Sequence, residues 1–357
     1  MPRIVKYRTL RRPADLAEAG LIAPARVAGL ERVAGIFELA VSPGMAALIS
    51  RENNSAGPIG RQFIPSSAEL ETAPGEIGDP IGDRKFSPVK GIVHRYPDRV
   101  LLKPSHLCPV YCRFCFRREQ VGRDGERLSP RELEAALDYI RARDQIWEVI
   151  VTGGDPFLLS PRRLREITRA LDAIPHLGVI RFHSRMPIVS PRSITSALVE
   201  ALAAKKAVYV VVHVNHPKEL TRDARAACAS LNQAGIPLLS QSVLLKGVND
   251  DSATLEKLFR DLVALRIKPY YLHHADLARG TAHFRVPLAE GRALMKRLRG
   301  RVSGLCQPAY VLDLPGGFGK VPVGPCYARP GEGPHEWLIE DMAGRLHCYP
   351  PGTGAKD

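Results

Sequence analysis

Three of the chain's seven cysteines, Cys108, Cys112 and Cys115, lie in the short stretch LCPVYCRFCFRRE. Three thiolates at the spacing C-x3-C-x2-C can hold a cubane iron–sulfur cluster, in which one iron stays free for another ligand. They can also hold a catalytic zinc ion with an open position, or they can be buried cysteines without a metal. A structural zinc ion would need a fourth ligand, and the nearest other cysteine in the sequence is Cys228.

Alternating strands and helices must position this cysteine loop. Short apolar runs predict six strands, and each is followed by a segment with helical periodicity. Such alternation implies parallel strands joined by crossover helices. Six units are too few for an eight-stranded barrel, so the sequence predicts an α/β fold with a partial, open (β/α)6 TIM-like barrel. The predicted strands are residues 100–103, 148–152, 179–183, 207–214, 237–244 and 269–273.

Polar residues cluster where these strands end. The cysteines follow the first strand, and the sequence GGD at 153–155 follows the second. His213 lies at the end of the fourth strand, Gln241 lies in the fifth, and Asp276 follows the sixth. Active sites of parallel α/β folds are built at the carboxyl ends of the strands. The pattern therefore predicts an enzyme.

The remaining sequence predicts three parts. Residues 1–90 form a helical and irregular extension, residues 91–300 form the barrel, and residues 301–357 form a C-terminal segment with a terminal β-hairpin. With 45% hydrophobic and 25% charged residues, the composition is that of a soluble globular protein. The N-terminus lacks an apolar signal region and no run of apolar residues could span a membrane, so we expect a cytoplasmic chain with reduced thiols.

The net charge of +14 permits nucleic acid, acidic proteins or anionic cofactors as partners. A basic RNA-modifying enzyme or a zinc-bearing nucleic-acid binder would use such a charge. The basic residues are scattered, however, and no RNA-binding motif accompanies them. We therefore predict that the chain binds no nucleic acid.

The cysteine spacing after the first strand, with GGD after the second, resembles the radical S-adenosylmethionine (SAM) superfamily. That resemblance implies a 4Fe–4S cluster on Cys108, Cys112 and Cys115 whose open iron binds SAM. In the superfamily, the glycine motif after the second strand positions the SAM amino group, and glycine allows a close backbone approach. The residues expected to contact this cofactor are Gly153, Gly154, Asp155, His213 and Gln241.

Four further segments, GIVHRYPDRVLL, HVNHPKELT, KPYYLHHAD and PGGFGK, resemble the lysine 2,3-aminomutase family, which also uses pyridoxal phosphate (PLP). The resemblance runs from about Pro58 to about Tyr349. It implies that Lys320 bonds covalently to PLP and that Arg95, Tyr96 and Arg99 grip the PLP phosphate. It further implies that the substrate α-carboxylate pairs with Arg117 and its distal ammonium with Asp276 and Asp313.

The implied reaction is the interconversion of L-lysine and β-lysine by 2,3-amino migration, with a reduced flavodoxin or ferredoxin as electron donor. The family offers two alternative substrates, arginine and lysine destined for elongation factor P. The PGGFGK segment resembles the enzymes that act on free lysine better. Longer members carry a cysteine-rich C-terminal extension, whose spacing the remaining cysteines here lack. We therefore predict no zinc and leave the oligomeric state open, a homo-oligomer included.

Overall fold

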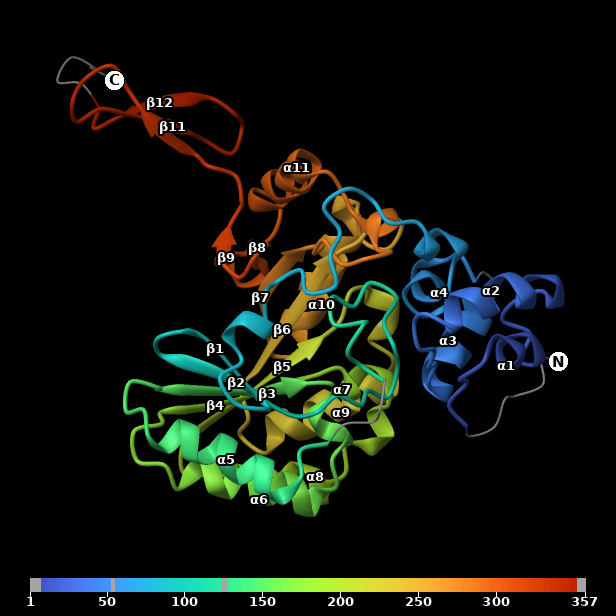
Figure 1. Ribbon diagram of the computed structural model, residues 1–357. Coiled ribbons are helices and arrows are strands. Elements are labelled where there is room, and N and C mark those ends of the chain that lie inside the picture. The colour runs from blue at the N-terminus through green and yellow to red at the C-terminus, as the bar shows by residue number, and fades with distance from the viewer. Residues whose placement is uncertain (1–7, 53–54, 123–126, 352–357) are drawn as a thin grey trace.

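A computed structural model describes residues 8–52, 55–122 and 127–351 (Figure 1). Nine strands form one sheet in which the spatial order follows the chain order from β1 to β9. Strands β2 to β8 are parallel, and β1 and β9 pair antiparallel at the two edges. The strands are β1 (Ile92–Tyr96), β2 (Arg99–Ser105), β3 (Glu148–Gly153), β4 (Val179–Ser184), β5 (Ala207–His213), β6 (Leu238–Leu244), β7 (Ile267–His274), β8 (Ala309–Leu314) and β9 (Gly319–Pro322).

Six βα units, from β2 to the helix after β7, confirm the predicted open (β/α)6 barrel. Helices α5 to α11 form the crossovers between the parallel strands, and Figure 1 shows α5, α6 and α8 along the outside of the sheet. The crossover helices are α5 (Pro130–Arg141), α6 (Pro161–Asp172), α7 (Met186–Val189), α8 (Ser196–Ala201), α9 (Arg222–Gln233), α10 (Ser252–Ala264) and α11 (Leu288–Arg299).

Local sequence explains where these elements begin and what they bury. Ser129 accepts a hydrogen bond from the Glu132 amide, and the Glu132 carboxylate accepts one from the Ser129 amide, so α5 starts at a capping box with Pro130 at its first position. In the centre of β5, Val210–Val212 are fully buried on both faces of the sheet. Such burial is expected of a parallel strand covered by helices.

The N-terminal extension packs beside the barrel and shares its hydrophobic core (Figure 1). Its helices are α1 (Pro13–Glu18), α2 (Val27–Ala34), α3 (Pro43–Glu52) and α4 (Pro58–Phe63). Leu16, Ile59 and Phe63 are fully buried and belong to the same cluster as residues of the barrel strands. The extension therefore has no separate core among the described residues.

Buried ion pairs also join the extension to the barrel. Glu69, which is 2% exposed, accepts hydrogen bonds from Arg113 at 2.6–3.1 Å and from Arg118. Glu76 pairs with Arg285 at 2.7 Å and accepts hydrogen bonds from backbone amides of the loop after β7. Because buried charges are costly unless they are paired, these acids are required where the arginines are buried.

The C-terminal part contains one strand more than a hairpin. The strands β11 (Trp337–Glu340) and β12 (Leu346–Tyr349) pair as an antiparallel hairpin, and β10 (Ala328–Pro330) pairs with β11 to complete a small separate sheet. Figure 1 shows this sheet projecting from the barrel. The third strand forms because residues 328–330, which precede the hairpin in the sequence, pair with β11. Residues 1–7 and 352–357, at the ends of the predicted parts, lie outside the described residues.

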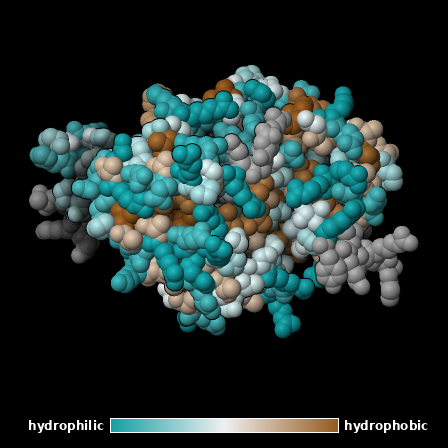
Figure 2. All heavy atoms as spheres, turned by 60° about the horizontal axis from the view of Figure 1, so that its bottom comes forward, coloured by the Kyte–Doolittle hydropathy of each residue, from teal (hydrophilic) through white to brown (hydrophobic). Residues whose placement is uncertain are grey.

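The face of the molecule shown in Figure 2 is predominantly polar. Figure 2 shows hydrophilic side chains around smaller hydrophobic areas on one face of the molecule. None of the helices in the described ranges combines the length and the apolar character needed to cross a membrane.

Replacing Glu69 tests whether the buried ion pairs hold the extension to the barrel. We expect Glu69→Ala to lower the free energy of unfolding by about 3–5 kcal/mol, because two guanidinium groups lose their buried counter-ion. Urea denaturation followed by circular dichroism measures this difference. Glu134→Ala is the matched control, because its pair with Arg141 lies at the surface and contributes about 1 kcal/mol or less. Equal losses in both variants would contradict the expectation.

Candidate active site

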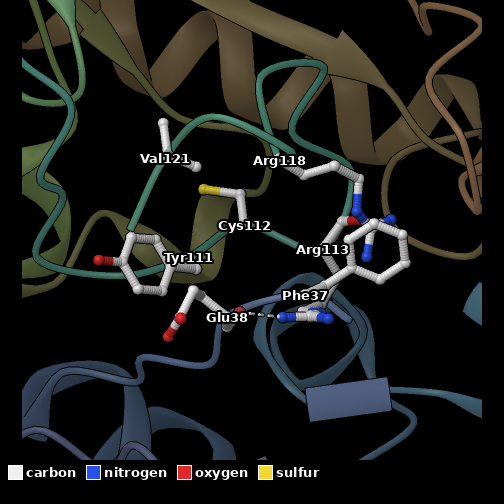
Figure 3. Close-up of a pocket in the computed structure, with 7 residues that line it drawn as sticks. All are labelled: Phe37, Glu38, Tyr111, Cys112, Arg113, Arg118 and Val121. Carbon is white, nitrogen blue, oxygen red and sulfur yellow. Dashed lines mark hydrogen bonds between the residues drawn. The ribbon is translucent and has the colours of Figure 1, made fainter. Parts of the chain in front are cut away.

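The three cysteines lie in the loop that follows β2, against the N-terminal extension. All three are half-buried, and Cys108 and Cys115 pack against the apolar group formed by Ala40, Tyr111 and Val121. Figure 3 shows Cys112 between Tyr111 and Val121 on one side and Arg113 and Arg118 on the other. The extension thus covers one side of the cysteine loop.

The thiols are close enough to influence each other's ionisation. Burial and, to a smaller extent, the neighbouring Cys112 raise the pKa of Cys115 to about 11. Burial also raises the pKa of Cys108 well above its usual value, with smaller contributions from Asp155 and the two other thiols. A positively charged metal centre would offset these effects, because metal binding deprotonates thiols. Among the described residues, no three His, Cys, Asp or Glu side chains converge tightly enough for a single metal ion. A cubane cluster does not require such convergence, because each thiolate binds a different iron.

The glycines after β3 hold the start of this loop. Gly154 donates its amide to the Ser105 carbonyl at 2.7 Å, and Asp155 donates its amide to the Leu107 carbonyl at 2.8 Å. A Cβ atom on Gly154 would lie 2.2 Å from the Leu107 oxygen. Gly153 has φ +108°, a backbone conformation that favours glycine. The close approach seen here is therefore between the glycines and the cysteine loop.

The carboxylate of Asp155 joins the ends of β3 and β4. It accepts hydrogen bonds from the Ser184 hydroxyl at 2.7 Å and from the backbone amides of Phe157, Arg185 and Met186. Burial raises the pKa of Asp155, whereas these hydrogen bonds act in the opposite direction. Asp155 thus orients the backbone from which Arg185 projects.

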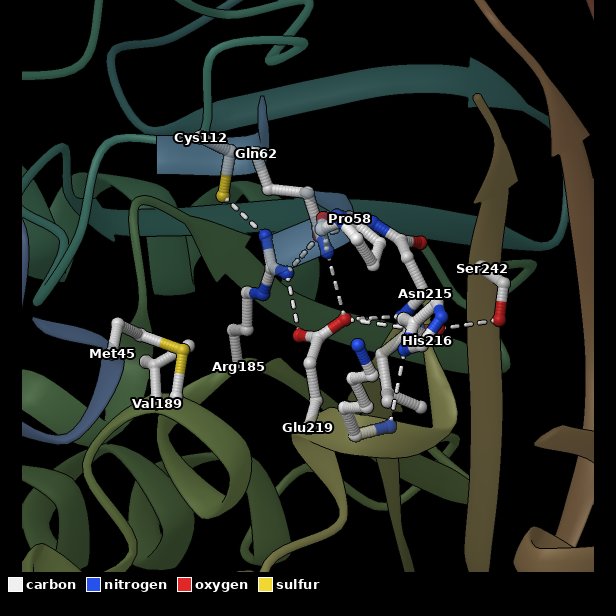
Figure 4. Close-up of polar contacts among 12 residues, drawn as sticks. Met45, Pro58, Gln62, Cys112, Arg185, Val189, Asn215, His216, Glu219 and Ser242 are labelled. Carbon is white, nitrogen blue, oxygen red and sulfur yellow. Dashed lines mark hydrogen bonds and ion pairs between the residues drawn. The ribbon is translucent and has the colours of Figure 1, made fainter. Parts of the chain in front are cut away.

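Arg185 connects the cysteine loop to a buried polar network (Figure 4). Its guanidinium lies 2.7 Å from the Cys112 sulfur and donates to Gln62 at 2.6 Å and to Glu219 at 2.7 Å. Gln62 and Glu219 are fully buried and are bonded to each other and to Asn215. A fixed cation beside Cys112 suits a thiolate that carries negative charge.

His213 and Gln241 lie opposite each other in the register of β5 and β6. The Nε2 atom of His213 is buried and has no hydrogen-bond partner within the described part of the chain. Burial lowers the pKa of His213 well below its usual value, and Arg185 and His273 lower it further. A neutral imidazole with an unsatisfied nitrogen fits a site that receives a polar ligand.

The glycine-rich segment between β8 and β9 presents Lys320 to the barrel interior. Asp313 and Lys320 are paired across the two strands, and the Lys320 amine forms an ion pair with the Asp313 carboxylate. The Tyr96 hydroxyl accepts a hydrogen bond from the Lys320 amide at 2.7 Å, and Arg99 stacks on the Tyr96 ring at 3.8 Å. Gly316, Gly317 and Gly319 all have positive φ, so this turn requires glycine.

A buried carboxylate, Asp83, gathers three cations next to Lys320. It lies 3.0 Å from Arg117, 3.2 Å from Arg95 and 3.8 Å from Lys103. Although burial acts to raise its pKa, Arg117 and the other cations hold the pKa of Asp83 below its usual value. Asp83 thus holds both Arg95, predicted to bind the PLP phosphate, and Arg117, predicted to bind the substrate carboxylate.

Asp276 completes this group of charges at the end of β7. Burial and the neighbouring Asp313 raise its pKa, Lys320 and Arg117 lower it, and the net result is a pKa of about 7. Asp276 therefore lies within electrostatic range of Asp313, Lys320 and Arg117.

Comparison with known proteins decides the family. Residues 102–259 match the Radical SAM superfamily. The chain is 42% identical to the L-lysine 2,3-aminomutase of Acetoanaerobium sticklandii over 92% of its own length and 79% of that protein. It is 37% identical to the enzyme of the same name from Fusobacterium nucleatum, over 97% of its own length and 80% of that protein. It is also 36% identical to the glutamate 2,3-aminomutase of Clostridioides difficile, over 84% of its own length and 70% of that protein.

The chain belongs to the lysine 2,3-aminomutase family. This confirms the predicted radical SAM fold and isomerase class, and with them the cofactors 4Fe–4S cluster, SAM and PLP. The described residues fit these groups. Arg185 places a cation at Cys112, and His213 offers an unsatisfied nitrogen. In the second part of the site, the buried Nε of Arg95 has no hydrogen-bond partner within the described ranges, as expected of a residue that awaits an anion.

Several residues of this aminomutase site were not predicted. Asp83 and Glu69 lie in the irregular extension, where single acids carry no periodic signal. Gln62 and Glu219 contact Arg185 from segments far apart in the sequence. His273 lies in the quoted segment KPYYLHHAD, and its position three residues before Asp276 was the available signal.

Substituting Gly154 tests its contact with the cysteine loop. We expect Gly154→Ala to displace the loop, because the added methyl overlaps a backbone carbonyl, at a cost of about 1–3 kcal/mol. After anaerobic reconstitution with iron and sulfide, the variant should show weaker cluster absorbance and less iron per chain than the wild type. Gly304→Ala is the control, because no atom lies within 4 Å of its added Cβ. Full cluster content in Gly154→Ala would refute this positional role.

Proposed function

We propose that the chain interconverts L-lysine and β-lysine by 2,3-amino migration. The observation that carries the proposal is the pair of carboxylates, Asp276 and Asp313, beside Lys320. Relatives at 37–42% identity named L-lysine 2,3-aminomutase support it. The reaction takes place in the cytoplasm, where the cysteines stay reduced, and a small acidic flavodoxin or ferredoxin supplies the electron.

The proposed roles divide the site into two halves. Cys108, Cys112 and Cys115 hold the cluster, and the polar residues at the ends of β3, β5 and β6 hold SAM: Gly153, Gly154, Asp155, His213 and Gln241. On the other side, Lys320 bonds to PLP. Arg95, Tyr96 and Arg99 hold its phosphate, and Arg117 pairs with the substrate α-carboxylate. Bidentate guanidinium groups suit both of these anions.

When bound, the cluster with SAM supplies a carbon-centred radical that removes a hydrogen atom, and PLP carries the migrating nitrogen. The residues of the chain bind and orient the substrate between these groups. Arg117 fixes the α-carboxylate, while Asp276 and Asp313 fix the distal end, so that the β-carbon has one position. The surrounding barrel strands exclude water from the site.

Charge at the distal end selects the substrate. Asp313 is paired with Lys320 in the structure, and a covalent bond between Lys320 and PLP removes that ammonium from Asp313. The α-amine of L-lysine would displace Lys320 from PLP as an uncharged amine, and the distal ammonium of L-lysine would then provide three donors for Asp313 and Asp276. A glutamate side chain would place a third carboxylate between these two acids, with repulsion that costs several kcal/mol. The likeness to a glutamate 2,3-aminomutase therefore does not extend to the substrate.

Substrate competition tests the proposed function directly. The reconstituted enzyme is given SAM, PLP, dithionite and one of L-lysine, L-arginine or L-glutamate, and the β-isomers are identified by mass spectrometry. We expect β-lysine to form fastest, because arginine is longer and displaces the β-carbon. β-Glutamate should form slowest, because of charge repulsion. Faster formation of β-glutamate than of β-lysine would overturn the proposal.

Asp276 predicts how L-lysine binding depends on pH. Its pKa of about 7 lies above the usual 3.8, so the neutral form predominates below pH 7 and the lysine ammonium must drive ionisation there. The apparent Kd should therefore rise as the pH falls below about 7, by up to about tenfold per pH unit. By the same linkage, the contribution of Asp276 to folding stability is complete below pH 3.8 and is lost as the pH rises through about 7.

The measurement is a titration of the PLP absorbance with L-lysine in the absence of dithionite, between pH 6 and pH 8. Asp276→Asn is the comparison, because its amide cannot ionise. It should bind L-lysine more weakly at pH 8 and lose most of the pH dependence. An unchanged pH dependence in this variant would show that another group controls binding.

A further inference from the structure

The Lys320 amine contacts two side chains rather than one. Its ion pair with Asp313 is accompanied by a contact of 3.3 Å to the Nδ1 atom of His273. The same Nδ1 atom lies 3.6 Å from the Asp313 carboxylate. The three residues come from the neighbouring strands β7, β8 and β9, and none of their side chains is more than 22% exposed. A rigid sheet therefore holds an amine, an imidazole and a carboxylate in mutual contact.

We propose that His273 is the base that takes a proton from Lys320 before this amine bonds to PLP, and that Asp313 stabilises the imidazolium so formed. In this step the Nζ–H bond of Lys320 breaks and an Nδ1–H bond of His273 forms, so one proton moves and no electrons are transferred. The inference rests on the proposed function of Lys320 as the PLP-binding residue.

The need for a base follows from the chemistry of the amine. An ordinary lysine is protonated at neutral pH and cannot act as a nucleophile in that form. A base must lie within hydrogen-bond reach of the proton that it removes. Among the described side chains, Asp313 and His273 are the hydrogen-bond partners of the Lys320 amine. A paired carboxylate favours the charged amine, so the imidazole is the group suited to accept its proton.

The surroundings of His273 support this role in both protonation states. Burial lowers the pKa of His273, and the Lys320 cation lowers it further, whereas Asp313 raises it. The imidazole is therefore neutral and can accept a proton while Lys320 is charged. After the transfer, Lys320 is uncharged and Asp313 faces an imidazolium instead. One positive charge remains beside one carboxylate, so the transfer leaves the local charge balance unchanged.

Other titratable groups face the same space from neighbouring elements. The ring of Tyr271 lies 5.6 Å from that of His273, and burial raises the pKa of Tyr271 above its usual value, so it stays neutral. Burial lowers the pKa values of His183 and His213 well below their usual values, so both also stay neutral. Charged neighbours in the described part of the chain include Arg181 on β4, Asp276 on the loop after β7 and Arg117 on the cysteine loop.

The test follows PLP incorporation rather than turnover. Chain freed of PLP, with its cluster reconstituted, is mixed with PLP at pH values from 6 to 9. Borohydride then traps PLP that is bonded to Lys320, and the trapped PLP per chain is measured over time. Because no L-lysine is used, the result does not depend on aminomutase activity. Absence of trapped PLP in the wild type would refute the proposed role of Lys320 itself, which separates that failure from failure of the proton transfer.

His273→Gln should incorporate PLP at least about tenfold more slowly than the wild type at pH 7, because an amide cannot take the proton. The difference should shrink as the pH rises, because hydroxide can then take the proton in place of the imidazole. His274→Gln is the matched control. It lies next along the same strand, its ring bonds to the Tyr310 hydroxyl at 2.7 Å, and its incorporation rate should equal that of the wild type.

Two results would overturn the proposal. One is a rate of PLP incorporation in His273→Gln that depends on pH in the same way as the wild-type rate. The other is a slowdown of equal size at every pH, because a purely structural defect does not depend on the protonation of Lys320. If His273→Gln fails to fold, as judged by loss of cluster absorbance, His273→Asn provides the same measurement with a smaller neutral amide.

Discussion

Carboxylates from the N-terminal extension neutralise the cations that the barrel buries around its catalytic end, and the rest of the site depends on these pairs. Glu69 holds two arginines of the cysteine loop, and Asp83 holds Arg95 and Arg117, two of the three arginines assigned to anionic groups. Without these acids, four guanidinium groups would be buried without counter-ions. The desolvation cost would then be comparable to the whole free energy of unfolding of a marginally stable fold. The extension is therefore a structural part of the active site and not an appendage to the barrel.

The two acids also impose geometry. Arg113 and Arg118 flank Cys115 in the sequence, so fixing both on Glu69 limits the conformations of the loop that carries the thiols. Asp83 links Arg95 of β1 to Arg117 of the same loop. The proposed phosphate and carboxylate sites are consequently coupled to each other through Asp83, and to the cysteines through the loop that carries Arg117. A reaction that requires a radical and a C–H bond to meet at short range benefits from such fixed positions.

The barrel could be predicted from the sequence because each of its parts is specified locally. The capping box at Ser129 and the apolar run at Val210–Val212 mark helix and strand without knowledge of distant contacts. The cysteine spacing and the glycine-rich segments are likewise local. Glu69 and Asp83 could not be found in this way, because their roles arise only where an irregular segment crosses the end of the barrel. The third strand of the C-terminal sheet was missed because Ala328–Pro330 has only three residues, without β-branched or aromatic side chains and with a proline at its end.

Pairing across strands explains why some roles in the site could be assigned only from coordinates. Asp313 and Lys320 are seven residues apart and were assigned separate functions, yet the register of β8 and β9 places them directly opposite each other. The Asp313 carboxylate therefore has a cation before any substrate arrives, and its charge is balanced in each state that the proposed reaction requires. The cation beside Asp313 is Lys320 in the cofactor-free chain and the imidazolium of His273 after proton transfer. Once L-lysine is bound, it is the distal ammonium of the substrate. A buried carboxylate that exchanges one cation for another avoids the desolvation cost of an unpaired charge at every stage.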